Sequence, residues 1–521
     1  MVGGGVVAAV AIAELAFRQG PQPYDSAKYF RTAVDFPDVP ADIWTLRIGL
    51  VLPVRLAVLA LGPSEAALYA VPFLVGLALA AATYGTTLLL AGDRVVAACA
   101  ALVLALYGDV LLRSSAILPD PAATATFTAS VFFLVLGARR PGRSGVASAA
   151  AAGALFGATY LIREFSPILL PAAVAVGFVL RYPLRRAAVV AGTAVSTAAL
   201  ELVYGAVQYG DPLVHLRMLV FRDRLADTTG PGVVPVRDQL DGLLDTLAVF
   251  PRLVLAWNSG WAILALGAVF LVALVVRFRD RRLWLLAGWA GSYWLAMALL
   301  GLGSFPSGRW LLNITSLRYW FPLLPALVMG GFVGIAVLLP RHSRLAAGVV
   351  AAPVAALAAA ALSIGPGLTE FARCADRDAW PNDQFGRWHD LRNWLATPEA
   401  ARFDVIATDL TTSRLVPAFT STTWGDRLWG GSVTADPVAR DRRQTLVLVH
   451  RARFGPDAEA EIAGLRSGRV PVFASRDGEL VALAAVSETT GPGVAWPARE
   501  PRAAATRGSC GTRPYAPQST G

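Results

Sequence analysis

The strongest constraint on the fold of this chain is a series of apolar stretches that recur from the first residues to about residue 363. About 20 apolar residues in a helix are enough to cross the hydrocarbon core of a bilayer, and most of these stretches approach that length. The chain has 521 residues and a mean hydropathy of +0.54, which is too apolar for a soluble globular protein. We therefore expect a mostly α-helical, polytopic membrane protein.

Hydropathy averaged over a helix-length window predicts about eleven transmembrane helices. They are expected at residues 1–19, 66–90, 95–112, 121–137, 145–162, 165–180, 187–208, 252–276, 283–301, 319–339 and 345–363. Residues 46–62 are also apolar, but Arg47, Pro53 and Arg55 interrupt them. We expect this segment to lie along the membrane interface rather than to cross the bilayer.

The arginines between the predicted helices indicate how the chain is oriented. They form four clusters, whose members are Arg139, Arg140 and Arg143; Arg181, Arg185 and Arg186; Arg277, Arg279, Arg281 and Arg282; and Arg341 and Arg344. With eleven spans, all four clusters fall on one side of the membrane, which the positive-inside rule makes the cytoplasmic side. The segments then expected outside are the loop that holds Asp25, the loops at 113–120, 209–250 and 302–318, and the tail from residue 364.

The formal net charge of +10 does not indicate a nucleic-acid-binding protein. The basic residues are almost all arginines in short clusters between apolar stretches, which is a pattern of membrane topology, so no nucleic-acid partner is expected. The three cysteines, Cys99, Cys374 and Cys510, lack the spacing of a metal site. Cys374 and Cys510 both fall in the external tail, where disulfides form, and we predict that they are linked.

The tail has the pattern of a small α/β domain at residues 364–486. A helix is predicted from apolar residues at helical spacing, which are Phe385, Trp388, Leu391 and Leu395. Strands are predicted after it at 404–407, 445–449 and 470–474. A hairpin turn is predicted at Arg476-Asp477-Gly478-Glu479. Beyond about residue 487, Pro, Gly, Ser and Thr dominate, and we expect residues 487–521 to form a flexible tail.

Residues 23–30 follow the first apolar stretch and bring acidic, basic and aromatic side chains to the point where the chain leaves the membrane. Asp25 lies there one helical turn from Lys28, the only lysine in the sequence. A carboxylate just outside a bilayer can meet a lipid head group and a water-soluble acceptor at once, so Asp25 is our candidate for the reaction centre. The alternative is that both charges are simply solvated in an exit loop.

Several short motifs resemble one known superfamily when their order and their membrane sidedness are taken together. The motifs are Asp25 and Tyr29 in the first external loop, Leu61-Gly62-Pro63-Ser64-Glu65, Leu118-Pro119-Asp120-Pro121, Gly157-Ala158-Thr159-Tyr160-Leu161-Ile162-Arg163, and Leu317-Arg318-Tyr319-Trp320-Phe321-Pro322-Leu323-Leu324-Pro325. Residues 1–363 resemble the GT-C superfamily of integral-membrane glycosyltransferases, in the branch of protein O-mannosyltransferases and lipid A aminoarabinose transferases. The tail matches only as an external α/β appendage.

The resemblance implies an inverting glycosyltransferase. Its donor would be a hexose or pentose on a polyprenyl phosphate, and its acceptor a protein, lipid or cell-wall glycan outside the cytoplasmic membrane. It implies that Asp25 is the general base that takes the proton of the acceptor hydroxyl. Ser26 stands where the family often has Glu. The cofactor is therefore left open, with a divalent metal as one candidate.

The resemblance also supplies candidates around the donor phosphate. Arg318 and Tyr319 match the family's Arg-Tyr pair, and the planar fork of Arg318 suits phosphate oxygens; the alternative is an arginine that snorkels to lipid head groups. Arg163 is a second candidate for the phosphate, with a simple pair to Glu164 as its alternative. Lys28 could pair with the phosphate or with Asp25.

Asp120 has a structural and a catalytic interpretation, which do not exclude each other. It stands between two prolines at the start of a predicted span, so it could be the helix N-cap. The resemblance implies that it also lines the site and contacts the sugar, the acceptor or a metal. Glu201 lies inside a predicted span, where either a polar cavity or a neutral buried carboxyl would explain it. His215 has no second metal ligand spaced with it in the sequence.

Two other functions remain open from the sequence. A transporter or flippase of lipid-linked saccharides would be expected to show internal repeats, and broken helices or charges near the bilayer midplane. The sequence shows no repeat, and apart from Glu201 its charges cluster at the ends of the predicted spans. A non-catalytic scaffold that presents the external domain is the third reading.

Overall fold

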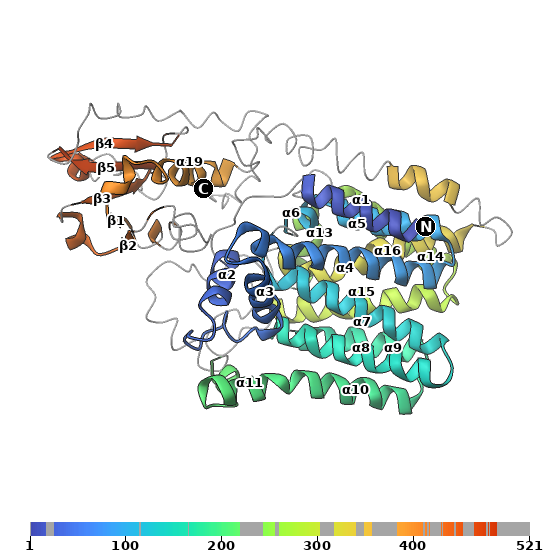
Figure 1. The fold of residues 1–521 in the computed structure, drawn as a ribbon. Helices are drawn as coiled ribbons and strands as arrows, with labels where there is room; N and C mark the ends of the chain where they lie inside the picture. The colour runs from blue at the N-terminus through green and yellow to red at the C-terminus, as the bar shows by residue number, and fades with distance from the viewer. Residues whose placement is uncertain are drawn as a thin grey trace. The chain divides into compact units, whose positions relative to one another are not determined.

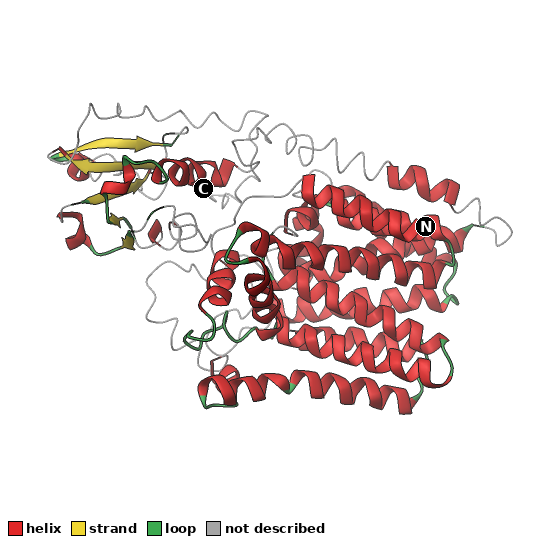
Figure 2. Cartoon of the chain, in the orientation of Figure 1, coloured by secondary structure: helices red, strands yellow, loops and turns green. Residues whose placement is uncertain are grey.

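The computed structural model contains two compact units, formed by residues 1–18, 35–56 and 69–368 and by residues 19–34, 57–68 and 369–521. Within them the structure describes residues 2–16, 25–113, 116–164, 166–218, 243–255, 260–302, 317–339, 348–356, 383–409, 412–413, 416, 429, 431–441, 444–451, 463–475, 478 and 480–486. Figures 1 and 2 show that the first unit is helical and that the second carries a β-sheet. The predicted domain boundary at residue 363 lies outside the described residues and stays a prediction.

The described part of the first unit consists mainly of helices. Its main helices are α1 (Val2–Ala16), α4 (Glu65–Ala91), α5 (Arg94–Leu106), α6 (Gly108–Arg113), α7 (Pro119–Arg139), α8 (Gly142–Ile162), α9 (Leu170–Val179), α10 (Leu184–Ala198), α11 (Leu200–Tyr209), α13 (Leu243–Leu255), α14 (Gly260–Val276), α15 (Arg281–Leu302) and α16 (Leu324–Leu338), with 3-10 helices η1 (Ser166–Leu169) and η3 (Leu317–Leu323). Two more helices, α2 (Asp25–Asp35) and α3 (Ile48–Leu61), have residues in both units, as does α4, whose first four residues belong to the second unit.

Five helical segments among the described residues are long and apolar enough to cross a membrane, which marks the chain as a membrane protein. They are Ala66–Ala91, Pro119–Arg139, Gly142–Ile162, Leu184–Tyr209 and Leu317–Leu338. Further apolar helices, such as α1, α5 and α14, are shorter. The mostly helical fold is therefore confirmed, whereas the count of about eleven spans stays a prediction.

The structure corrects two of the predicted continuous helices. The segment predicted at 95–112 bends where Tyr107 takes an extended backbone conformation between α5 and α6. The segment predicted at 252–276 is divided between α13 and α14, and a Cβ on Gly260 would collide with the carbonyl oxygen of Val254. Hydropathy cannot detect either break because the residues on both sides are apolar.

Small residues decide how closely α8 and α10 pack. A Cβ on Gly153 would collide with the carbonyl oxygen of Val190, and one on Gly157 would lie 2.5 Å from the carbonyl oxygen of Ala194. Glycine thus lets the two backbones approach, as is common between membrane helices. Gly157 follows Gly153 along α8, and its neighbour Ala194 follows Val190 along α10, so the two helices run parallel (Figure 1).

The second unit contains a five-stranded mixed sheet. Its strands are β1 (Val405–Ala407), β2 (Ser432–Thr434), β3 (Thr445–His450), β4 (Arg469–Ala474) and β5 (Leu480–Ala485), in the spatial order β2-β1-β3-β5-β4. The first three positions in this order pair parallel, whereas β5 pairs antiparallel with both β3 and β4. Helix α19 (Asp383–Leu395) packs on β4 and β5. The predicted small α/β domain is therefore present.

The local predictions for this unit hold where the structure describes them. Trp388, Leu391 and Leu395 line the buried face of α19, as their spacing predicts. The β4–β5 pair is the predicted hairpin, and Gly478 in its turn has φ +65°, a conformation that glycine adopts without strain. Cys374, Cys510 and the predicted flexible tail lie outside the described residues, so the disulfide stays a prediction.

Candidate active site

Asp120 lies in the first turn of α7, but it does not cap that helix. The N-cap is Leu118, which offers no side-chain hydrogen bond, so the predicted capping role is wrong. The flanking prolines suit a first helical turn, where an N–H is not needed. The carboxylate of Asp120 is only 3% exposed, and it points into the protein instead of back to the helix end.

Arg163 is the residue that pairs with Asp120. It ends α8 as the C-cap, with an extended backbone, and its Nη1 contacts Oδ1 of the carboxylate. The other oxygen, Oδ2, has no hydrogen bond among the described residues and lies 4.0 Å from Nε of Arg318. A buried carboxylate therefore holds one guanidinium directly and faces a second.

Tyr319 lies between these two arginines. The guanidinium carbon of Arg163 is 4.7 Å from the centre of the Tyr319 ring, and that of Arg318 is 4.9 Å from it, so both can make cation–π contacts. Nη2 of Arg318 also donates to the Tyr319 hydroxyl at 3.0 Å. The hydroxyl of Tyr293 in α15 donates to the Tyr319 carbonyl at 2.5 Å, which fixes the backbone under the ring.

The apolar residues of η3 explain why Arg318 and Tyr319 are held in place. Trp320 and Phe321, which follow them, are fully buried. The Trp320 ring lies 5.5 Å from that of Phe250 in α13 and 6.5 Å from that of Trp294 in α15. The side chain of Arg318 remains 31% exposed, so it is the more accessible cation of the pair.

A buried ion pair between Arg47 and Glu164 adjoins this cluster. Nε and Nη2 of Arg47 donate to the two carboxylate oxygens at 2.7 and 2.5 Å, and the Glu164 side chain is fully buried. Burial alone would raise the pKa of Glu164, but the hydrogen bonds and charge of Arg47 outweigh it and lower that pKa below its ordinary value. The predicted alternative, a simple pair between Arg163 and Glu164, is thus wrong.

Breaking this pair is expected to destabilise the first unit strongly. Glu164→Gln would leave the buried guanidinium of Arg47 without a counter-charge, at a cost of about 3 kcal/mol. Thermal unfolding in detergent measures this, with Asp280→Asn as the control, because the Asp280–Arg282 pair is partly exposed and should contribute under about 1 kcal/mol. Since folding lowers the pKa of Glu164, the difference should begin to shrink as the pH falls below about 4, near the ordinary pKa of a glutamate, and should vanish only once the folded carboxyl is protonated. Equal destabilisation by both variants would contradict the interpretation.

A small cavity opens beside the charged residues. Its volume is about 20 Å³, enough for one water molecule. Polar groups of Asp120, Arg163, Ser166, Tyr293 and Tyr319 line one part of it, and apolar side chains line the rest. Buried polar groups around a small void are typical of a site that holds a ligand atom or water.

Asp25 and Lys28 belong to the second unit, whereas Asp120, Arg163 and the Arg318–Tyr319 pair belong to the first. Asp25 is the first residue of α2 and is half-buried, so the predicted exit loop is a helix from this point. Tyr29, one turn further, is fully buried, while Lys28 is exposed. The catalytic role of Asp25 and the phosphate role of Lys28 stay predictions.

Glu201 and His215 form a cluster that the sequence did not reveal. The hydroxyl of Tyr160 in α8 donates to one Glu201 oxygen at 2.6 Å, and Nδ1 of His215 lies against the other. Burial lowers the pKa of His215, although the charge of Glu164 acts in the opposite direction. Among the described residues, no group of three or more His, Cys, Asp or Glu side chains could hold a metal ion.

Comparison with solved structures identifies the fold of this chain. No protein-family model and no curated protein sequence matches the chain. Two solved structures of ArnT from Cupriavidus metallidurans, one bound to undecaprenyl phosphate and one in the apo state, align with TM-scores of 0.60 and 0.61 at 13% and 12% identity. Each alignment covers 94% of this chain and 98% of ArnT. The Archaeoglobus fulgidus oligosaccharyltransferase in complex with Zn and sulfate aligns at 0.51 and 15% identity, over 92% of this chain and 73% of that one.

The chain has the GT-C fold. The resemblance predicted from the order of the short motifs is therefore confirmed at the level of the fold. Among the described residues, the three arginines Arg47, Arg163 and Arg318 gather around two carboxylates, those of Asp120 and Glu164. Such a cluster, with its most exposed member at the edge, can attract and hold an anion.

Proposed function

We propose that this chain is an inverting glycosyltransferase that moves a sugar from a polyprenyl-phosphate donor to an acceptor outside the cytoplasmic membrane. The observation that carries the proposal is the cluster of Arg163, Arg318 and Tyr319 around the buried carboxylate of Asp120. Two guanidinium groups side by side suit the oxygens of a phosphate. Nucleotide sugars are scarce outside the membrane, so an activated sugar has to arrive there on a lipid.

The arginines would act on the leaving group. As the bond between the sugar and the phosphate breaks, negative charge grows on the departing phosphate oxygen. Arg318, which is partly exposed, can meet these oxygens with the two nitrogens of its fork, and Arg163 behind it adds a second fixed charge. Because both side chains are held against Tyr319 before the donor arrives, little reorganisation is needed in the transition state.

Asp120 would serve this site in two ways. Through Oδ1 it orients Arg163, and through Oδ2, which has no hydrogen bond among the described residues, it can accept one from a sugar or acceptor hydroxyl. A buried acceptor without a donor is costly, so a hydroxyl that supplied that bond would be favoured. This matches the contact with sugar or acceptor that the sequence predicts for Asp120.

Asp25 would be the general base and Lys28 a partner for it or for the phosphate. Attack by the acceptor hydroxyl on the anomeric carbon releases a proton, and a carboxylate within hydrogen-bond reach can take it. The products are then the glycosylated acceptor and the polyprenyl phosphate. No metal role is assigned, because the described residues offer no set of three suitable ligands; a divalent metal remains a candidate cofactor.

The solved structures that share this fold support the choice of donor class. The ArnT structure contains undecaprenyl phosphate, a lipid of the kind proposed here, and the oligosaccharyltransferase structure contains sulfate, an anion of similar shape to phosphate. A lipid-linked donor held in the bilayer also agrees with the apolar helices that surround the cluster.

Purified chain in proteoliposomes tests the proposal against its main alternative, a flippase. With a polyprenyl-phosphate donor that carries a radiolabelled sugar and a cell-envelope extract as acceptor, we expect the label to leave the lipid and to appear in a new product. Arg163→Gln should slow this roughly tenfold or more, because it removes a charge beside the phosphate. Movement of intact donor across the bilayer without cleavage would instead identify a flippase.

A further inference from the structure

The N-terminal ends of α8 and α10 lie side by side. These helices run parallel, and a Cβ on Gly145 near the start of α8 would meet the guanidinium of Arg186 near the start of α10 at 2.8 Å. Figure 1 shows both helices starting at the same end of the first unit. Two helix dipoles therefore point the same way, and their positive ends coincide.

Neither helix end is capped by the side chain of its own N-cap residue. The N-caps are Pro141 and Pro183, and neither provides a side-chain hydrogen bond to the amides of the first turn. Helix N-termini whose first-turn amides lack a side-chain cap can bind anions, because the N–H groups and the helix dipole both favour negative charge. The pair of ends thus forms a region of positive potential before any charged side chain is counted.

Arginines increase this positive potential further. Six of them lie in the two turns that precede these helices or in the first turns themselves: Arg139, Arg140, Arg143, Arg181, Arg185 and Arg186. Among the described residues, none of the six has a carboxylate within ion-pair distance, and Glu164 is the only acidic residue between positions 121 and 200. Arg186 donates to the carbonyl oxygens of Gly137 and Arg140 at 2.6 and 3.0 Å, which holds it in the turn.

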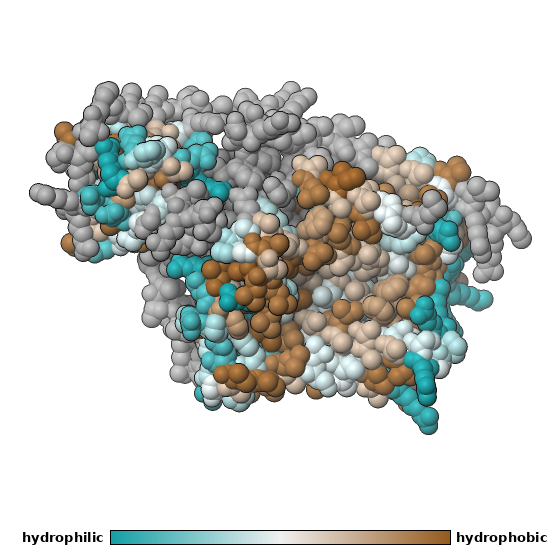
Figure 3. All heavy atoms as spheres, viewed as in Figure 1, coloured by the Kyte–Doolittle hydropathy of each residue, from teal (hydrophilic) through white to brown (hydrophobic). Residues whose placement is uncertain are grey.

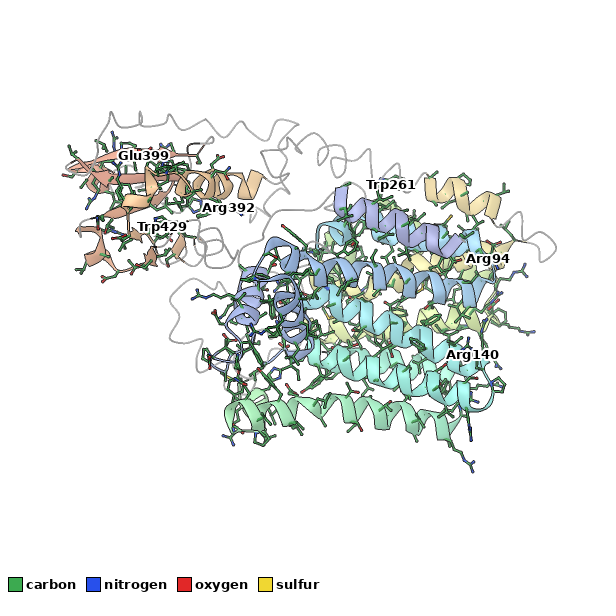
Figure 4. All side chains as sticks on the ribbon, viewed as in Figure 1. Arg94, Arg140, Trp261, Arg392, Glu399 and Trp429 are labelled. Carbon is green, nitrogen blue, oxygen red and sulfur yellow. The ribbon has the colours of Figure 1, made fainter. Side chains whose placement is uncertain are left out.

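A cavity that is wide open to the surface lies where the two ends meet. Its volume is about 570 Å³, and it is lined by Gly142, Arg143, Val146, Pro183, Arg185 and Arg186. Exposed apolar side chains lie near its lining residues in the sequence: Leu184, between Pro183 and Arg185, is 88% exposed, and Phe178 at the end of α9 is 83% exposed. Figure 3 shows hydrophilic residues gathered at this end of the unit beside an apolar surface, and Figure 4 labels Arg140 there.

We propose that this cavity binds the phosphate of an anionic phospholipid of the bilayer. The phosphate would accept hydrogen bonds from Arg143 and Arg185 and from the first-turn amides of the two helices. The acyl chains would lie along the exposed apolar face of α10, which includes Val195 at 69% exposure. This apolar surface favours a lipid over free phosphate.

The lipid site is separate from the proposed donor site. Arg163 ends α8, and the cavity is at the start of the same helix, which has 21 residues. At 1.5 Å per residue these ends are about 30 Å apart, which is the thickness of the hydrocarbon core. The two phosphates would therefore lie in opposite leaflets. The lipid proposal does not depend on the glycosyltransferase proposal.

Lipid binding to the full chain in a neutral detergent tests the site. The measurements are native mass spectrometry, for the dissociation constant, and thermal unfolding, with phosphatidylglycerol, phosphatidylcholine or inorganic phosphate added. The test variant is the double change Arg143→Gln with Arg185→Gln. The control is Arg277→Gln with Arg279→Gln, which removes the same charge from exposed positions in another turn.

We expect phosphatidylglycerol to raise the unfolding temperature of the wild type and the control, and to bind the test variant about tenfold to thirtyfold more weakly. Both altered side chains are exposed, so the variant should fold, and its unfolding temperature without lipid checks this. Equal weakening in the control would mean that only the overall charge matters and would overturn the site. Equal responses to phosphatidylcholine, or to inorganic phosphate, would overturn the anionic lipid as its ligand.

Discussion

Replacing Asp25 by Asn is expected to lower turnover by roughly 10² to 10⁴, with the donor still bound. Asparagine keeps the size of the side chain and one hydrogen bond, but it cannot take the proton from the acceptor hydroxyl. Because Asp25 begins α2 and is only half-buried, the change should leave the fold intact. Rates of sugar transfer under saturating donor, together with donor affinity, measure the two parts of this expectation.

Matched controls are available in the same segment. Asp35 ends α2 and Asp38 follows it, and both are exposed. Asp35→Asn and Asp38→Asn should stay within a few fold of wild type. Near wild-type transfer by Asp25→Asn would remove Asp25 from the mechanism and make Asp120 the next carboxylate to test. Rescue of the variant by added metal would instead indicate that Asp25 is a metal ligand.

The second large effect is expected at Arg318. Arg318→Ala should weaken donor binding and lower turnover, together by roughly 10² in kcat/KM, because two charge-assisted hydrogen bonds to the phosphate are lost. Arg318→Lys should recover only part of the loss, since a point charge cannot reproduce the planar fork or its contact with the ring of Tyr319. Steady-state kinetics with varied donor measures both changes.

Arg217 provides the control for Arg318. It is 64% exposed and makes a surface pair with Asp211 at 3.1 Å, so Arg217→Ala should have little effect. If the Arg217 and Arg318 variants lose activity equally, Arg318 has no specific role at the phosphate. If Arg318→Ala unfolds the chain, the Lys variant still separates the fork from the charge.

Much of the fold follows from local pattern. The apolar lengths predict helices such as α4, α7 and α8 within a few residues, and the spacing of Trp388 and Leu391 predicts the buried face of α19. These features depend on neighbours in sequence, which a window of residues can capture. The break between α13 and α14 brings Gly260 against the backbone of Val254, and average hydropathy does not detect it, although Asn258-Ser259-Gly260 is a turn-like sequence.

The candidate site is predictable only in part, for the same reason. The motifs single out Asp120, Arg163, Arg318 and Tyr319, and the structure brings these four together. Which carboxylate each arginine contacts could not be predicted, because Arg163 turns away from its neighbour Glu164 toward a residue 43 positions earlier.

The partner of Glu164 is more distant still, since Arg47 lies 117 positions away. The contact of Glu201 with His215 was also missed, although only 14 positions separate them, because it forms across the turn that follows α11. The available sign was a charged residue close to a predicted helix end for Glu164, and a charged residue inside a predicted span for Glu201. That sign indicates that a partner exists without identifying it.

The anomeric configuration of the product tests the central claim, an inverting transfer from a lipid phosphate, most directly. Nuclear magnetic resonance of the product formed from a polyprenyl-phosphate donor of known configuration should show the opposite configuration at the transferred carbon, because one displacement with Asp25 as base inverts it once. A retained configuration would contradict the account, since it requires two displacements through a covalent glycosyl-enzyme.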